Sequence, residues 1–152
     1  MRLQYHLIYR NTIETESLMP KVKAINHVAV VVDDMDKSLS FWRDALGIRL
    51  QELRDVPAEK SQVAFLPLAG SEIELVKPTS DDSGIAKYLA KRGPGMHHIC
   101  VEVDDIEGML AQLKSRGIRL INETPRLAAD GKKYAFVHPE STSGVLVEIY
   151  QV

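Results

Sequence analysis

The sequence predicts an α+β fold in which two pseudo-symmetric βαβββ units form a half-barrel. Three segments of the chain occur twice, roughly 70 residues apart. The pairs are HVAVVVDDM at 27–35 with HICVEVDDI at 98–106, Gly47-Ile48-Arg49-Leu50 with Gly117-Ile118-Arg119-Leu120, and Ile73-Glu74-Leu75 with Val147-Glu148-Ile149. A repeat of this length indicates two copies of one supersecondary unit.

The first unit begins with a strand at 22–32, predicted from its β-branched residues. Asp34 is expected to cap the helix that follows, which has apolar residues at helical spacing and ends at Gly47. Short strand patterns complete the unit at 48–53, 62–66 and 72–76.

The second unit repeats this order after a connecting helix predicted at 82–92. Its first strand is expected at 97–103, and Asp105 opens a helix that Gly117 ends. The remaining strands are predicted at 119–122, 133–137 and 145–150.

Length and composition are those of an ordinary globular domain. The chain has 152 residues, of which 45% are hydrophobic and 26% charged, with a net charge of −2. This charge gives no general attraction to nucleic acid or membranes, and no apolar run has the length of a membrane span. Neither is therefore expected as a partner. The single cysteine, Cys100, lies in an apolar strand pattern and is predicted to be a buried, inert thiol.

The repeat also suggests the domain boundaries. Residues 1–21 stand outside it and are interpreted as an N-terminal extension, without the continuous apolar core of a secretory signal. Residues 22–152 form the predicted domain, with its two units at about 22–80 and 95–152.

Each unit supplies one histidine and one glutamate of metal-ligand type. His27 and His98 open the first strands, and Glu74 and Glu148 lie near the ends of the last strands. Strand residues alternate between faces, so all four side chains can point into one cavity. Two imidazoles and two carboxylates suit a divalent first-row metal ion. A single histidine or glutamate in a strand is more often structural. Here both types recur in both units, and each glutamate lies among apolar residues, where burying an unpaired carboxylate costs free energy. This recurrence favours a set of metal ligands.

Neighbouring polar residues are assigned structural roles. His97 adjoins His98 and is expected to face the opposite side of the strand. The pairs Asp33-Asp34 and Asp104-Asp105 could act as carboxylate dyads, but their position directly before each helix favours N-capping.

These residues resemble the vicinal oxygen chelate superfamily over residues 22–152, and within it the methylmalonyl-CoA epimerases. The segments most similar to the epimerases are Ile25-Asn26-His27-Val28-Ala29, Gly95-Met96-His97-His98-Ile99, and Phe136-Val137-His138-Pro139 with the run that continues to Glu148. The resemblance implies epimerisation of methylmalonyl-CoA at C2 through an enolate, with His27, Glu74, His98 and Glu148 as metal ligands.

The resemblance also implies a cofactor and an assembly. The cofactor would be a divalent ion, Co²⁺ ahead of Zn²⁺, Mn²⁺, Ni²⁺ or Mg²⁺, and the protein would be a homodimer. The single cysteine suits a reducing compartment, so the expected location is the cytoplasm, with the mitochondrial matrix as the open alternative.

Glu148 matches a family residue that is both ligand and acid/base, whereas the second acid/base is left open by the resemblance. Some members carry a further glutamate on the third strand of the first unit, but Lys60–Phe65 has no carboxylate at the matching place. Glu74 can serve instead, as its counterpart does in glyoxalase I. Two alternatives therefore stand beside the epimerase: a glyoxalase I-like lyase acting on a hemithioacetal, and a drug-sequestering protein without turnover.

Overall fold

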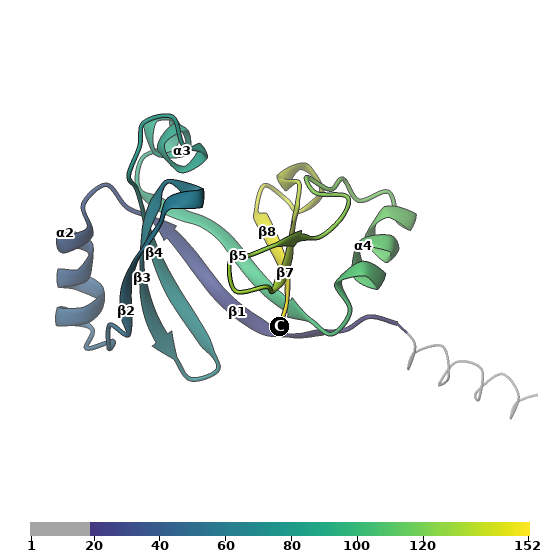
Figure 1. Cartoon of the computed structure of the whole chain (residues 1–152), viewed down its shortest axis with the longest axis horizontal. Helices are drawn as coiled ribbons and strands as arrows, with labels where there is room; N and C mark the ends of the chain where they lie inside the picture. Colours follow the sequence, from purple (N-terminus) through teal and green to yellow (C-terminus); the bar gives the residue numbers. More distant parts are fainter. Residues whose placement is uncertain (1–18) are drawn as a thin grey trace, which may run out of the picture.

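Strands β1 (Val22–Val31) and β5 (Gly95–Val103) run antiparallel through the centre of the molecule (Figure 1). The computed structural model describes residues 19–152, and these strands lie in the middle of its eight-stranded sheet of order β2-β3-β4-β1-β5-β8-β7-β6. β4 is parallel to β1, and β8 is parallel to β5. The two halves of the curled sheet therefore have the same connectivity, which confirms the predicted α+β half-barrel.

The first unit continues from β1 with α2 (Met35–Leu39), η1 (Ser40–Ala45), β2 (Glu52–Val56), η2 (Pro57–Glu59), β3 (Ser61–Leu68) and β4 (Ser71–Pro78). The strand predicted at 48–53 is misplaced, because pairing with β3 begins only at Glu52. Ile48 and Leu50 instead pack against the apolar cluster between α2 and the sheet. Their hydrophobicity therefore reflects burial in a connecting segment.

After α3 (Gly84–Arg92) and β5, the second unit contains α4 (Ile106–Ser115), β6 (Arg126–Leu127), β7 (Lys133–Val137), η3 (Pro139–Ser141) and β8 (Leu146–Gln151). The strand predicted at 119–122 is wrong. The segment makes an isolated bridge between Leu120 and Val137 and a backbone bond from Ile121 N–H to Phe136 O at 2.8 Å, but no continuous ladder. The Asn122 side chain accepts the backbone N–H of Phe136 at 2.9 Å. A side-chain bond thus replaces a ladder bond there, and pairing resumes at the two-residue β6.

Both helix starts follow the predicted capping. Asp34 Oδ1 accepts the backbone N–H of Lys37, and Asp105 Oδ1 accepts that of Gly108, each at 3.0 Å. The first helix is not α-helical throughout, because its second half, η1, winds as a π-helix. These caps turn the chain abruptly from the central strands into the helices that cover the outer face.

The apolar core is divided between the two units. One cluster joins α2 to β3 and β4 and consists of Val32, Met35, Leu39, Ala64, Leu66 and Leu75. A second joins α4 to the second half of the sheet and consists of Val103, Ile106, Met109, Leu110, Ala135, Val137 and Ile149. A third, smaller cluster consists of Ala29, Val63 and Val76. Since strand residues alternate, the neighbours Glu74 and Glu148 point to the other, inner face.

Most of the predicted N-terminal extension, 1–21, lies outside the described residues, which begin at Met19. Within the described part of the chain, no helix combines the length and apolar character that crossing a bilayer requires.

Candidate metal centre

The two predicted histidine ligands meet at the centre of the sheet. The register pairs His27 with Cys100 and Ala29 with His98, so the two imidazoles lie diagonally across the β1–β5 pair. His27 Nε2 is 3.0 Å from His98 Nε2. The two side chains are only 9% and 11% exposed, so pairing of the central strands buries both donors together.

Glu148 joins this pair from β8. Its Cα is in register with that of Cys100, and its Oε2 lies 2.9 Å from His98 Nε2 and 3.3 Å from His27 Nε2. Three donor atoms from three strands therefore form one compact triangle. Ligands bound at about 2.0–2.2 Å to a common ion lie about 3.0–3.5 Å apart, so the donors His27, His98 and Glu148 fit a divalent ion in both chemistry and spacing.

Glu74 reaches the site from β4, where its register partner on β1 is Ala29. Its Oε1 lies 3.5 Å from His27 Nδ1, the ring nitrogen that faces away from the triangle. Glu74 and Glu148 thus approach opposite sides of the same imidazole. The structure brings all four predicted residues together, with Glu74 on the flank of the other three.

The two glutamates have opposite electrostatic environments. Burial raises the pKa of Glu148, but hydrogen bonds and positive charge from His27 and His98 outweigh it and lower that pKa to about 2. Burial also raises the pKa of Glu74, to about 7, and repulsion by Glu72 and Glu148 adds to the effect while attraction by His27 opposes it. Burial lowers the pKa of His27, but its hydrogen bond to Glu148 and the charges of both glutamates give a net increase. The two carboxyl groups occupy equivalent positions in the repeat but have clearly different pKa values. Such a difference is typical of paired acid and base groups.

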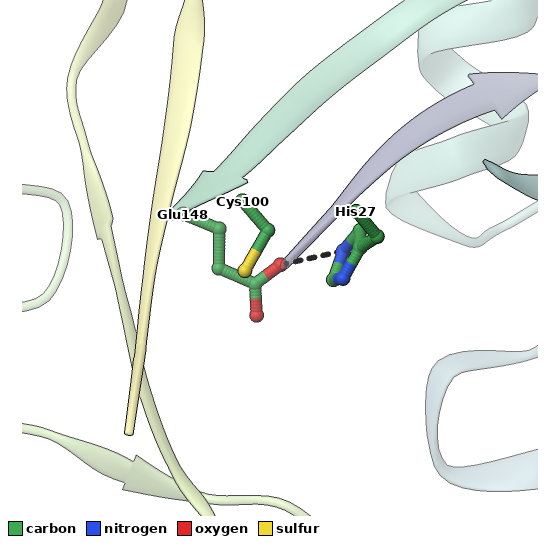
Figure 2. Close-up of side chains that lie close together, drawn as sticks. All are labelled: His27, Cys100 and Glu148. Carbon is green, nitrogen blue, oxygen red and sulfur yellow. Dashed lines mark ion pairs between the residues drawn. The ribbon is translucent and has the colours of Figure 1, made fainter. Parts of the chain in front are cut away.

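Cys100 lies against this group, which sequence reasoning did not anticipate. Figure 2 shows its sulfur beside the Glu148 carboxylate and the His27 ring, with ligand atoms within 4.8 Å of one another. The side chain is fully buried, and burial together with the nearby carboxylates raises the pKa of its thiol. Only a thiolate is a good ligand, so the prediction of a buried, unreactive thiol agrees with this environment.

The expected orientation of His97 is wrong. Its Nδ1 lies 2.8 Å from His98 Nδ1, although adjacent strand residues ordinarily face opposite sides. The ring also contacts Tyr88 of α3 edge-on, with centroids 4.8 Å apart. A cavity of about 220 Å³ adjoins it and is lined by Tyr88, Arg92, Met96, His97, Pro139, Gly144, Val145 and Leu146.

Aromatic residues border the glutamates. Phe65 is the β3 partner of Glu74, and Phe136 is the β7 partner of Glu148. The Phe136 ring also lies edge-on to His98, with centroids 5.5 Å apart. The two phenylalanines occupy equivalent positions in the repeat. This recurrence is visible in the sequence, but a comparison restricted to ligand-type residues does not include it.

Comparison with known proteins agrees with this geometry. Residues 26–136 match the model of the Glyoxalase/Bleomycin resistance protein/Dioxygenase superfamily. The chain belongs to this superfamily. The superfamily membership confirms the resemblance inferred from the paired histidines and glutamates.

Within the superfamily, the chain is similar to methylmalonyl-CoA epimerases. It is 40% identical over 132 residues to the mitochondrial methylmalonyl-CoA epimerase of Mus musculus. The match covers 86% of this chain and 74% of the relative. It is 38% identical to the ethylmalonyl-CoA/methylmalonyl-CoA epimerase of Cereibacter sphaeroides, over 84% of this chain and 97% of the relative.

A solved structure gives the same grouping. A Streptomyces coelicolor methylmalonyl-CoA epimerase in complex with 2-nitronate-propionyl-CoA superposes with a TM-score of 0.78 at 28% identity. The match covers 86% of this chain and 95% of that one. The half-barrel described above is thus the fold of an epimerase solved with a CoA thioester ligand.

Proposed function

We propose that this protein is a methylmalonyl-CoA epimerase, which inverts the configuration at C2 of its substrate. One observation at the site carries the proposal: Glu148 contacts Nε2 of His27 and Glu74 contacts Nδ1, so the carboxyl groups lie on opposite sides of one ring. Inversion requires a proton to leave one face of C2 and another to reach the opposite face. Two carboxyl groups on opposite sides of the site can perform both transfers.

The proton movements follow from the environments of the two glutamates. Glu148, with a pKa of about 2, is ionised at neutral pH and accepts the C2 proton, leaving an enolate. Glu74, with a pKa of about 7, is partly protonated and delivers its proton to the other face. The C–H bond broken on one side is thus replaced by a C–H bond on the other. The two residues exchange roles in the reverse direction.

We assign the metal donors to His27, His98 and Glu148, with Glu74 as the fourth donor from the flank. A divalent ion held by these residues would supply Lewis acidity that stabilises the negative charge of the enolate. The mixed nitrogen and oxygen donors suit Co²⁺, our first choice, and also accept Zn²⁺, Mn²⁺, Ni²⁺ or Mg²⁺. The Phe136 ring packs edge-on against His98 and places an apolar surface beside the site.

The test is conversion of one methylmalonyl-CoA epimer into the other by metal-loaded protein, with incorporation of deuterium at C2 in D₂O. Ethylmalonyl-CoA serves as a second substrate, and the methylglyoxal–glutathione hemithioacetal as the comparison. We expect epimerisation and exchange with methylmalonyl-CoA. Turnover of the hemithioacetal alone would overturn the proposal in favour of a glyoxalase I-like lyase, and binding without any turnover would favour a drug-sequestering protein.

We also propose that the protein acts in the cytoplasm or in a mitochondrial matrix.

Residues 22–152 suffice for this activity in our proposal, because the sheet and all four site residues lie within 22–152. A variant that begins at Met19 should keep the activity of the full chain. Loss of activity by a folded variant would show that the N-terminal extension belongs to the functional unit.

A further inference from the structure

Two β-bulges bracket the histidine pair in the central strands. Asn26 is an extra residue in β1 and His97 is an extra residue in β5, and the pairing steps over both; a further shift, at Lys23 near the start of β1, lies apart from this pair. Asn26 lies between the register pairs Ile25–Val101 and His27–Cys100. His97 lies between the pairs Ala29–His98 and Val30–Met96. Each extra residue directly precedes a proposed ligand, at an equivalent position of the repeat. Bulges next to active sites commonly redirect a side chain.

Both redirected side chains contact the histidine that follows them. Asn26 Oδ1 lies 3.0 Å from His27 Nδ1, and His97 Nδ1 lies 2.8 Å from His98 Nδ1. In each case the contact involves the ring nitrogen that faces away from the Nε2–Nε2 pair. The two units therefore use the same geometry with different acceptor groups, an amide oxygen in one and an imidazole nitrogen in the other.

The metal site proposed above requires a particular tautomer of each ligand. Nε2 of His27 and of His98 must each present a lone pair, so each neutral ring must carry its proton on Nδ1. Asn26 Oδ1 can accept the first of these protons. A single proton occupies the contact between two imidazoles, so His97 must accept the second with its own proton on Nε2.

We propose that Asn26 and His97 are positioning residues, which hold His27 and His98 in the Nδ1–H tautomer and in the ring orientation that directs both Nε2 atoms at the metal. This inference rests on the proposed metal site and deepens it. Partners of this kind orient metal-bound histidines and increase their basicity.

Further contacts hold each acceptor in place. The Asn26 amide Nδ2 donates to Glu102 Oε2 at 3.4 Å, which orients the amide so that its oxygen faces His27. The His97 ring lies edge-on to Tyr88, at an interplanar angle of 78°, and the Tyr88 hydroxyl donates to the backbone carbonyl of Met96 at 2.7 Å. β5 and α3 together therefore fix the second acceptor.

The repeat provides a matched pair of variants. His97→Phe keeps an aromatic ring beside Tyr88 but cannot accept a proton, whereas His97→Asn introduces the acceptor that the chain itself uses at position 26. Co²⁺ is titrated into chelator-treated protein and followed by its visible absorption. Loss of such a partner typically weakens metal affinity ~10–100-fold, so we expect that loss for His97→Phe and an affinity within several-fold of the parent for His97→Asn.

The hydrogen bond between His97 and His98 is measured separately in Zn²⁺-loaded protein by ¹⁵N NMR of the histidine rings. We expect the Nδ1–H proton of His98 to exchange slowly with solvent in the parent and in His97→Asn, and rapidly in His97→Phe. Circular dichroism and thermal unfolding show which variants are folded. If His97→Phe does not fold, His97→Leu rather than an Asn26 variant carries the same two measurements, because His27 Nδ1 keeps Glu74 Oε1 at 3.5 Å even without Asn26.

Parental Co²⁺ affinity and unchanged exchange of the His98 Nδ1–H proton in folded His97→Phe would overturn the inference, as would equal losses in both His97 variants. If the parent binds neither Co²⁺ nor Zn²⁺, the proposed metal site itself fails, and the inference that rests on it fails too. Neither measurement uses methylmalonyl-CoA, so neither depends on the substrate.

Discussion

Glu74 and Glu148 occupy equivalent positions in the repeat but differ in their nearest partners. Glu148 Oε2 has two imidazole nitrogens within 3.3 Å, and their attraction outweighs the effect of burial on its pKa. Glu74 has one imidazole nitrogen at 3.5 Å, and burial dominates. The position of the carboxylate on one side or the other of the His27 ring therefore separates a carboxyl group of lowered pKa from one of raised pKa.

Glu148→Gln should abolish most of the epimerisation. The amide retains an oxygen for coordination but cannot accept the C2 proton, and a general base typically contributes ~10²–10⁴-fold to the rate. Rates are compared at verified metal occupancy, because a neutral amide is a poorer ligand than a carboxylate. Glu123→Gln, at an exposed ion pair with Lys114, is the matched control and should be unaffected. Near-parental epimerisation by metal-loaded Glu148→Gln would remove this residue from proton transfer.

Glu74 should make the metal-free protein less stable as pH rises. Its folded-state pKa of about 7 lies above the ordinary value of 4.5, so between these values the native state binds more protons than the unfolded state. Stability is then lost as pH rises through this window, by up to about 3 kcal/mol. In urea unfolding from pH 5 to 8, Glu74→Gln should gain stability relative to the parent as pH increases. A constant difference between the two proteins would contradict the assignment.

At the scale of single residues, the repeat alone predicted the two histidines and two glutamates that the structure brings together. It could not reveal which sides of His27 the two glutamates approach, since this depends on side-chain geometry. The role of His97 was also hidden, because strand alternation predicts the opposite face and only a bulge in β5 reverses it.

At the scale of elements, the aspartate caps are the features that local sequence determines most directly. Asp105 Oδ1 accepts the Gly108 N–H at the start of α4, whose residues Ile106 and Leu110 enter the second core. Asp105→Ala should lower the free energy of unfolding by about 1 kcal/mol, since it leaves a helix N–H without its acceptor. Asp105→Asn should retain most of the parental stability. Chemical denaturation measures both, and equal losses in the two variants would exclude the cap as the cause.

The strands were predictable where both neighbours are strands and failed where tertiary contacts replace pairing. Ile48 and Leu50 have strand-like hydrophobicity but pack against the first core before β2 begins. In the second unit, the side chain of Asn122 substitutes for a backbone partner of Phe136. Neither substitution leaves a periodic signal, so strand patterns alone could not distinguish them from sheet pairing.

At the scale of the molecule, the site lies between the two units and belongs to neither. Each unit packs its own apolar cluster under its own helix, and each supplies one histidine and one glutamate. A single unit thus cannot assemble the donor triangle. The central β1–β5 pairing is what creates the site.

A homodimer is our prediction for the assembly, based on the family resemblance. Leu53 and Leu127 are exposed on the edge strands β2 and β6, where unpaired strand edges also favour association. Light scattering should give twice the chain mass of 17.0 kDa. A monomeric mass throughout the micromolar range would disprove the dimer.

The register shifts at Asn26 in β1 and at His97 in β5 compensate each other. Asn26 displaces the pairing by one position and His97 displaces it back, so that 24–25 and 30–31 of β1 pair with β5 in the same register; the separate shift at Lys23 comes before both. Deletion of either residue would leave one flank shifted by one, and a shift of one residue turns every side chain of that flank to the other face. Deletion of both would preserve the alternation while removing both acceptors. Insertions and deletions at these two positions are therefore expected to be tolerated only in pairs.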